Sequence, residues 1–152
     1  PKGIPTNLLP YLLRVAKKEI EKISVFGNDY QTPDGTCIRD YIHIEDLAQA
    51  HLQSYDYLLQ QEVEAQAKEN WSSAQFEVFN IGTWTGKSVK EILMITESIV
   101  WEPIAHTVWE RRDGDVAVSV ANPTKARQVL HWEPQKTIVD AVQDAWNFYS
   151  RA

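Results

Sequence analysis

Two arginines far apart in the sequence are candidates for binding an anion. Arg39 begins the run RDYIH, and Arg112 lies in the run RRDGD. A guanidinium binds phosphate through two parallel hydrogen bonds, and a carboxylate such as that of Asp115 accepts one from a ribose hydroxyl. In a strand, alternate side chains share a face, so Arg39, Tyr41 and His43 would line one polar cleft. An exposed edge strand and a solvated charge cluster are equally compatible with the two runs.

A second candidate is the run GTWTGKS at residues 82–88, which resembles a phosphate-binding P-loop. It falls between an expected strand and an expected helix, but it is one residue short between its glycines. Ser88 and Glu91 together have the spacing of a capping box. We therefore interpret the run as a strand-to-helix turn. A P-loop nucleotide hydrolase would require phosphate binding that depends on Lys87.

Composition restricts the class of protein. With 152 residues, 43% of them hydrophobic and 24% charged, the chain is expected to form a single globular domain over 1–152. The formal charge of -6 is spread along the chain without a basic stripe, so nucleic acid is not an expected partner. No apolar run is long enough to span a membrane. Cys37 is the single cysteine, which indicates a reducing compartment such as the cytoplasm.

The residues that could do chemistry must be positioned by short strands and helices, which together predict an α/β or α+β fold. Expected helices cover 7–20 and 44–61 and begin near Ser88, Pro123 and Ile138, the last behind a capping box of Thr137 and Asp140. Expected strands cover 23–27, 38–43, 76–81 and 105–108. His51 falls on the apolar stripe of its helix, so we expect it, like the six tryptophans, to pack in the interior.

Several runs occur in the same order as in one family. They are IPTNLLPY at 4–11, VFGNDY at 25–30, DGTCIRDYIH at 34–43, VFNIG at 78–82, GKSV at 86–89 and RRDGD at 111–115. The chain resembles, over nearly all of its length, the C-terminal portion of the UDP-glucose (UDP-galactose) 4-epimerases. These are extended short-chain dehydrogenases/reductases with a Rossmann-type fold. The combination of GNDY with RDYIH is the most specific part of the resemblance.

The resemblance implies a UDP-sugar site. Positions that match Arg39 and Arg112 bind the pyrophosphate, those that match 24–26 hold the uracil, and Asp115 matches the ribose contact. Ser119 matches a position beside the sugar, where a small residue leaves room for an N-acetylated sugar. The implied substrate-binding residues are Asn7, Leu8, Ser24, Phe26, Arg39, Tyr41, Val89, Arg112, Asp115 and Ser119.

The family's redox machinery has no counterpart here, because the six glycines form no NAD fingerprint and no tyrosine has a lysine four positions later. The resemblance implies a substrate-binding region without the N-terminal NAD-binding part and without catalytic residues of its own. When joined to that NAD-binding domain, it would interconvert UDP-glucose and UDP-galactose through a 4-keto intermediate. A non-catalytic interaction module and another UDP-sugar epimerase or dehydratase are the alternatives.

Without such a partner domain, the helix from Ile44 and the strand 76–81 would expose apolar surface and an open strand edge. We therefore expect self-association. The side chains expected to be buried by it are Leu47, Leu52, Val78 and Ile81.

Overall fold

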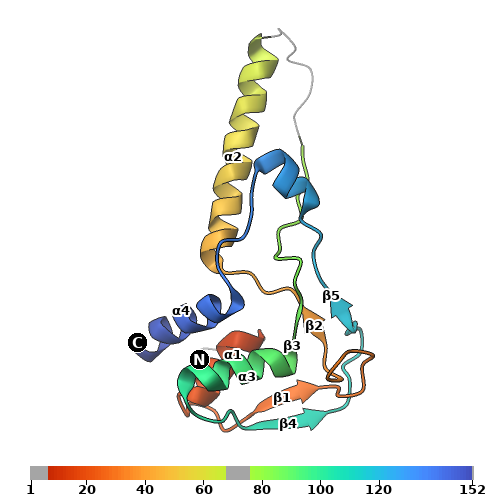
Figure 1. Ribbon diagram of the computed structural model, residues 1–152, viewed down its shortest axis with the longest axis vertical. Helices are drawn as coiled ribbons and strands as arrows, with labels where there is room; N and C mark the ends of the chain where they lie inside the picture. Colours follow the sequence, from red (N-terminus) through yellow and green to blue (C-terminus); the bar gives the residue numbers. More distant parts are fainter. Residues whose placement is uncertain (1–6, 68–75, 152) are drawn as a thin grey trace.

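The computed structural model describes residues 7–67 and 76–151, and Figure 1 shows how their elements are arranged. The mixed α/β class predicted from the sequence is confirmed. In chain order the elements are α1 (Leu8–Ala16), β1 (Ile23–Phe26), β2 (Ile38–Arg39), α2 (Ile44–Ala67), β3 (Lys87–Ser88), α3 (Val89–Val100), β4 (His106–Trp109), β5 (Val118–Ser119), the π-helical turn η1 (Ala126–Leu130) and α4 (Ile138–Arg151).

The strands form two small sheets. β1 pairs with β4 in parallel, with Ile23 opposite His106 and Phe26 opposite Trp109. In the other sheet β2 is central, antiparallel to β3 and parallel to β5, so that Arg39 lies opposite Ser119. Residues from two distant parts of the chain are thereby brought beside Arg39.

A first hydrophobic core lies between helices and β1. α1 and α3 pack on each other, and α4 contacts both (Figure 1). Alternation along β1 directs Ile23 and Val25 into this core and leaves Ser24 and Phe26 half-buried on the other face. The buried members of the core are Leu12, Val15, Ile23, Val25, Ile92, Leu93 and Ile104.

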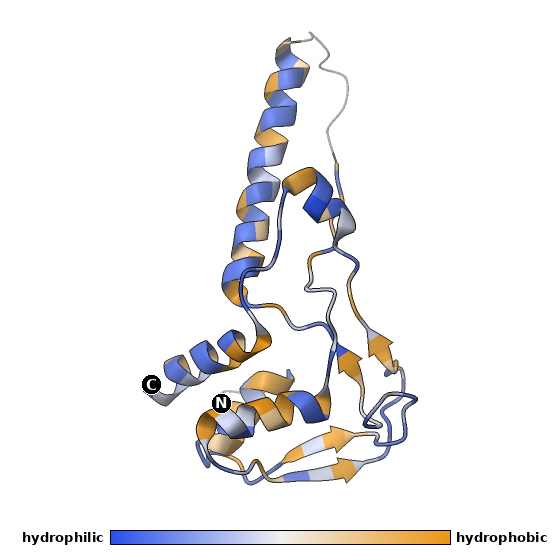
Figure 2. Ribbon diagram, in the orientation of Figure 1, coloured by the Kyte–Doolittle hydropathy of each residue, from blue (hydrophilic) through white to orange (hydrophobic). Residues whose placement is uncertain are grey.

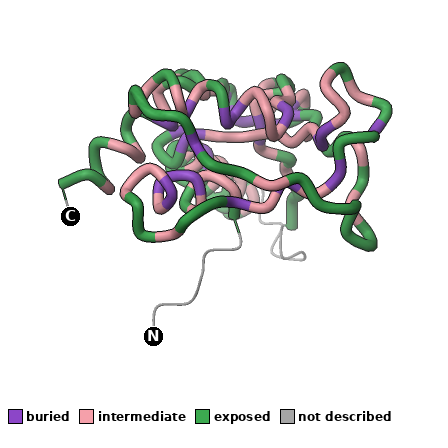
Figure 3. Tube along the Cα trace, turned by 90° about the horizontal axis from the view of Figure 1, so that it is seen from below, coloured by how far each residue is buried: buried purple, intermediate pink, exposed green. Residues whose placement is uncertain are grey.

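A second, smaller core lies between α2 and η1. It contains Ala50, Ala126, Leu130 and Trp132, and the indole Nε1 of Trp132 donates to the carbonyl oxygen of Asp46 at 3.0 Å. The rest of α2 extends away from α1, α3 and the β1–β4 sheet (Figure 1). Hydrophobic and hydrophilic residues are intermixed along the length of α2 (Figure 2). Buried stretches of the trace are short and are interrupted by exposed ones (Figure 3).

The predicted helix starts agree well with the structure. Ser88 and Glu91 form the reciprocal capping box of α3, and Thr137 and Asp140 exchange equivalent bonds at the start of α4. At the third start, Asn122 accepts from the backbone nitrogen of Thr124, two residues before η1 begins. Side-chain oxygens at these positions satisfy backbone donors that a helix leaves unpaired, which is why sequence alone locates them.

Several other predictions were wrong. Residues 76–81 pair with no strand in the described part of the chain, and β2 ends at Arg39 instead of His43. His51 is exposed, because α2 is covered only along the narrow face that holds Ala50. The exposed tryptophans are Trp84, Trp101 and Trp109, whereas Trp132 is buried, Trp146 is half-buried and Trp71 lies outside the described residues.

The loop between β1 and β2 is fastened to α3 by Asp34. Its carboxylate accepts from the backbone nitrogen of Thr36 at 2.8 Å and from the hydroxyls of Thr36 and Ser88. Burial would raise the pKa of Asp34, but these hydrogen bonds outweigh it and hold that pKa below its usual value. Hydrogen bonds from Ser88 and Lys87 likewise lower the pKa of Glu91.

These depressed pKa values predict loss of stability in acid. A carboxylate with a lower pKa in the folded state contributes stability above its unfolded pKa of about 4, and loses it as the pH falls through the folded value. We expect the free energy of unfolding to be level between about pH 7 and pH 5 and to decline below about pH 4. Urea unfolding followed by circular dichroism measures it. Asp34→Asn should reduce the decline, whereas Asp56→Asn on the exposed face of α2 should retain it; equal declines would contradict the role of Asp34.

Candidate functional site

A cavity of about 620 Å³ opens between α1, β1, the end of β2 and the start of α4. Each predicted site residue except Ser119 contributes to its wall. The predicted residues that line it are Asn7, Leu8, Ser24, Phe26, Arg39, Tyr41, Val89, Arg112 and Asp115. Ser119 is exposed on β5, beside Arg39 in the sheet register.

The two arginines meet at one carboxylate. Arg112 Nε lies 2.9 Å from Asp115 Oδ2, and Arg39 Nη2 lies 3.7 Å from Asp115 Oδ1. Guanidiniums separated by 73 positions in the sequence thus face the same cavity. Two guanidiniums that converge on one space are suited to binding an anion with two phosphate groups.

Each guanidinium is held by further contacts. Arg39 Nη1 donates to the carbonyl oxygens of Ile38 and Val116, both at 2.8 Å. The Arg112 guanidinium carbon lies 4.7 Å from the centre of the Phe26 ring, which is cation–π distance. The arginines are therefore oriented before any ligand arrives, which lowers the entropic cost of binding one.

Tyr41 supplies a neutral hydroxyl to the cavity wall. Burial raises the pKa of Tyr41 to about 12, although the nearby charge of Arg39 acts in the opposite direction. The phenol is therefore protonated at neutral pH and is available as a hydrogen-bond donor.

Asp40 organises the loop that resembles a P-loop. Its carboxylate accepts from the backbone nitrogens of Thr83 at 3.0 Å, Trp84 at 3.3 Å and Ala121 at 3.2 Å. A Cβ on Gly82 would come within 2.4 Å of this carboxylate, so the loop closes only with glycine there. The loop's donors are occupied by a carboxylate of the chain itself, and Lys87 pairs with Glu91 at 2.9 Å. Residues 82–86 therefore form a turn between the segment 76–81, unpaired among the described residues, and β3, which leads directly into α3. The geometry of this turn does not favour a P-loop.

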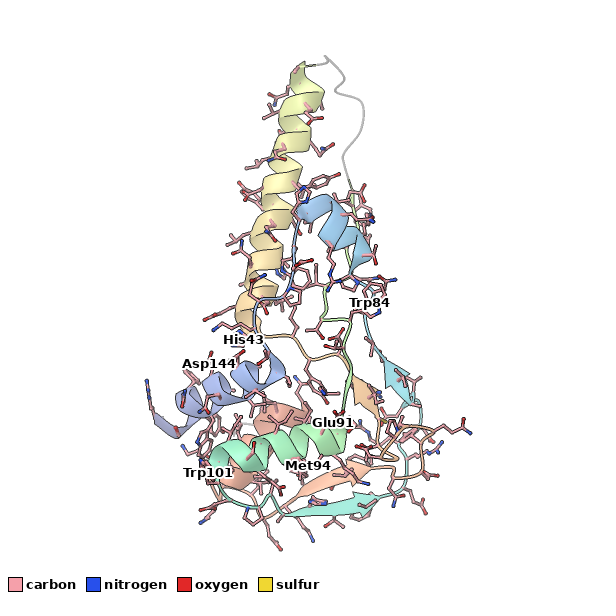
Figure 4. The ribbon with its side chains drawn as sticks, viewed as in Figure 1. His43, Trp84, Glu91, Met94, Trp101 and Asp144 are labelled. Carbon is pink, nitrogen blue, oxygen red and sulfur yellow. The ribbon has the colours of Figure 1, made fainter. Side chains whose placement is uncertain are left out.

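His43 does not share the cavity with Arg39 and Tyr41. Its Nδ1 accepts from the backbone nitrogen of Glu45 at 3.1 Å, and its Nε2 lies 3.3 Å from a carboxylate oxygen of Asp144 on α4. Figure 4 shows both labelled side chains where α2 and α4 meet. The predicted alternation fails at His43 because the strand has already ended at Arg39.

Sequence reasoning missed several lining residues, which are Leu9, Pro10, Tyr11, Val25, Cys37, Asp40, Ile42, Ile138 and Ala141. Leu9, Pro10 and Tyr11 lie in the run 4–11 that resembles the family, so their place in that run could have indicated them. Ile138 and Ala141 gave none, because they depend on how α4 packs against α1.

The described residues contain no group of three or more His, Cys, Asp or Glu side chains arranged to hold a metal ion. Within the same residues, no helix combines the length and the apolar character that a membrane crossing needs.

The sheets, the helices around them and the paired arginines define the C-terminal region of an extended short-chain dehydrogenase/reductase. The chain belongs to the GDP-mannose 4,6 dehydratase family, whose family model matches residues 1–145. It is 38% identical over 150 residues to the UDP-glucose 4-epimerase of Bacillus subtilis and 42% identical over 146 residues to that of Rhizobium meliloti. These alignments cover 99% and 96% of the chain and 41% of each relative.

The chain also matches solved structures of UDP-glucose 4-epimerases. The UDP-glucose 4-epimerase of Stenotrophomonas maltophila, with bound NAD and formylated UDP-arabinopyranose, matches with a TM-score of 0.88 and 34% identity. That of Bifidobacterium longum, in complex with NAD+ and UDP, matches with a TM-score of 0.86 and 37% identity. Each match covers 99% of this chain and 41% of the solved chain, so the chain spans about two fifths of the length of these relatives.

Proposed function

We propose that residues 1–152 form a single UDP-sugar-binding domain, the substrate-binding part of a UDP-glucose 4-epimerase. The convergence of Arg39 and Arg112 on one cavity carries this proposal. The two guanidiniums would bind the diphosphate, and Asp115 would accept hydrogen bonds from the ribose. The half-buried face of β1, with Ser24 and Phe26, would hold the uracil.

The remaining lining residues complete the proposed pocket. Asn7, Leu8 and Val89 would enclose the nucleotide, and Tyr41 would donate from its neutral hydroxyl. Ser119 leaves space beside Arg39 for a sugar with an N-acetyl group. Equal binding of UDP-glucose and UDP-N-acetylglucosamine is expected, and failure to bind the N-acetylated sugar would contradict this part.

NAD does not fit the described residues. The loop 82–86 is the segment closest to a phosphate-binding turn, and its backbone donors at Thr83 and Trp84 already bond Asp40. In the complete enzyme, NAD would therefore be held by an N-terminal domain outside this chain, which would supply the hydride chemistry of galactose metabolism in the cytoplasm. This chain's own part is to bind and orient the UDP-sugar.

Titration calorimetry with UDP tests the proposal. Arg112→Ala should weaken UDP binding by about 10- to 100-fold, because it removes a charge-assisted contact to phosphate. Arg111→Ala is a matched control, since Arg111 pairs with Asp29 and lies over the Tyr30 ring outside the cavity. It should change the affinity by less than about twofold. No UDP binding by the wild type would favour the alternative, a non-catalytic interaction module.

We further propose that the chain self-associates through α2 and residues 76–81. Leu52 and Val78 are 59% and 60% exposed. Leu47, on the same helix as Leu52, and Ile81, in the same segment as Val78, are half-buried. Analytical ultracentrifugation is expected to show a dimer or larger assembly, which Leu52→Lys should dissociate. A wild-type monomer at micromolar concentration would contradict this proposal.

A further inference from the structure

The carboxylate of Asp115 lies between the two guanidiniums of the cavity. Oδ2 is 2.9 Å from Arg112 Nε, and Oδ1 is 3.4 Å from Arg112 Nη2 and 3.7 Å from Arg39 Nη2. Both arginines therefore already share an anion that belongs to the chain. We propose that Asp115 determines specificity by competing with diphosphate for these guanidiniums, so that a diphosphate binds well only when it carries a ribose. This inference rests on the proposed function.

The three charges explain the competition. Two guanidiniums and one carboxylate leave a formal charge of +1, whereas the guanidiniums alone would present +2. The Asp115 side chain is 19% exposed, less than that of Arg39 at 29% or Arg112 at 58%. A partly desolvated carboxylate that loses its partners to a diphosphate is left without compensation and beside like charge, which is unfavourable.

A ribose would remove this cost. Its hydroxyls are donors, and a carboxylate displaced from the guanidiniums can accept from them. A nucleoside diphosphate thus satisfies the arginines and the carboxylate together, whereas pyrophosphate satisfies only the arginines. Selection arises from the penalty on the wrong ligand as much as from contacts to the right one.

The local backbone keeps the three groups together. Gly114 has φ of +85°, and the backbone nitrogen of Asp115 donates to the carbonyl oxygen of Arg112, which places both side chains on one side of a turn. Arg39 donates to the carbonyl oxygen of Val116, the next residue of the same turn. Because Phe26 restrains Arg112 as well, Asp115 is the group free to yield to a ligand.

Calorimetry at fixed ionic strength with pyrophosphate and with UDP tests the competition. Asp115→Asn should bind pyrophosphate about tenfold more tightly than the wild type, because the two ion pairs of the carboxylate no longer compete. UDP should gain less, since an amide oxygen is a weaker acceptor for the ribose hydroxyls than a carboxylate. Asp115→Glu, which keeps a carboxylate, should retain wild-type preference. Asp113→Asn is the matched control: it makes the same charge change at an exposed neighbour and should leave pyrophosphate affinity unchanged.

The outcomes separate this inference from the proposed function. If the wild type binds UDP but Asp115→Asn gains no more pyrophosphate affinity than Asp113→Asn, the proposed competition is overturned and the proposed function is not. An equal gain for UDP and pyrophosphate would overturn selection for ribose. No UDP binding by the wild type overturns the proposed function and the selective role with it.

A measurement on the wild type keeps the test independent of how the variants fold. Carbon-13 resonances of carboxyl groups report their hydrogen-bond partners. Saturating pyrophosphate should move the Asp115 carboxyl resonance, because its guanidiniums are withdrawn. An unmoved resonance with pyrophosphate bound would overturn the competition.

Discussion

Asp40→Ala is expected to lower the free energy of unfolding by about 3 kcal/mol, because each backbone donor left unpaired on losing its acceptor costs about 1 kcal/mol or more. The carboxylate joins the end of β2 to the loop at Thr83 and Trp84 and to the chain after β5 at Ala121. The carboxylate therefore adds a second link between three segments that the pairing of β2 with β3 and β5 already brings together. Because Asp40 also borders the cavity, ligand binding should be lost with the fold.

Urea unfolding monitored by circular dichroism measures this effect. Asp56→Ala, at an exposed position of α2, removes the same group where it closes no loop and should cost under about 0.5 kcal/mol. Asp40→Asn should lie between the two, since the amide oxygen retains part of the acceptor capacity. Equal stability of Asp40→Ala and Asp56→Ala would show that the carboxylate is not a structural link.

Trp132→Ala is expected to destabilise the protein by about 3–5 kcal/mol. The indole is 1% exposed and is the largest side chain of the core between α2 and η1. Its removal would leave a cavity among Ala50, Ala126 and Leu130, which are too small to fill it. It would also leave the Asp46 carbonyl oxygen without the indole donor.

Chemical denaturation compared with Trp101→Ala tests this prediction. Trp101 is 90% exposed at the end of α3, so removing the same side chain there should change stability by less than about 0.5 kcal/mol. Trp132→Phe should lose an intermediate amount, because it keeps ring volume but not the hydrogen bond. A Trp132→Ala variant as stable as Trp101→Ala would contradict the assignment of this core.

What the sequence predicted correctly is local. Ser88 with Glu91 and Thr137 with Asp140 satisfy backbone groups within a single turn, so spacing alone identifies them. The prediction of the substrate-binding residues has a different basis. All except Ser24 and Ser119 lie in runs that resemble a known family, and all except Ser119 line one cavity.

The errors concern tertiary contacts. Residues 76–81 have the composition of a strand, but a strand requires a partner, and sequence does not name one. His51 lies on an apolar stripe of α2, yet only the part of that helix beside η1 is covered. The acceptor role of Asp40 was missed because its partners are 43 and 81 positions away. Periodicity within a segment carries no information about such distant partners.

The division of the interior into two cores has a consequence for how the molecule opens. Amide hydrogens of α2 and η1 depend on the smaller cluster around Trp132, whereas those of α3 and β1 depend on the larger one. Segments with fewer buried contacts exchange with solvent through partial opening, at lower free energy than the whole. Heat or denaturant would therefore unfold α2 and η1 first and leave α3 and β1 folded for longer.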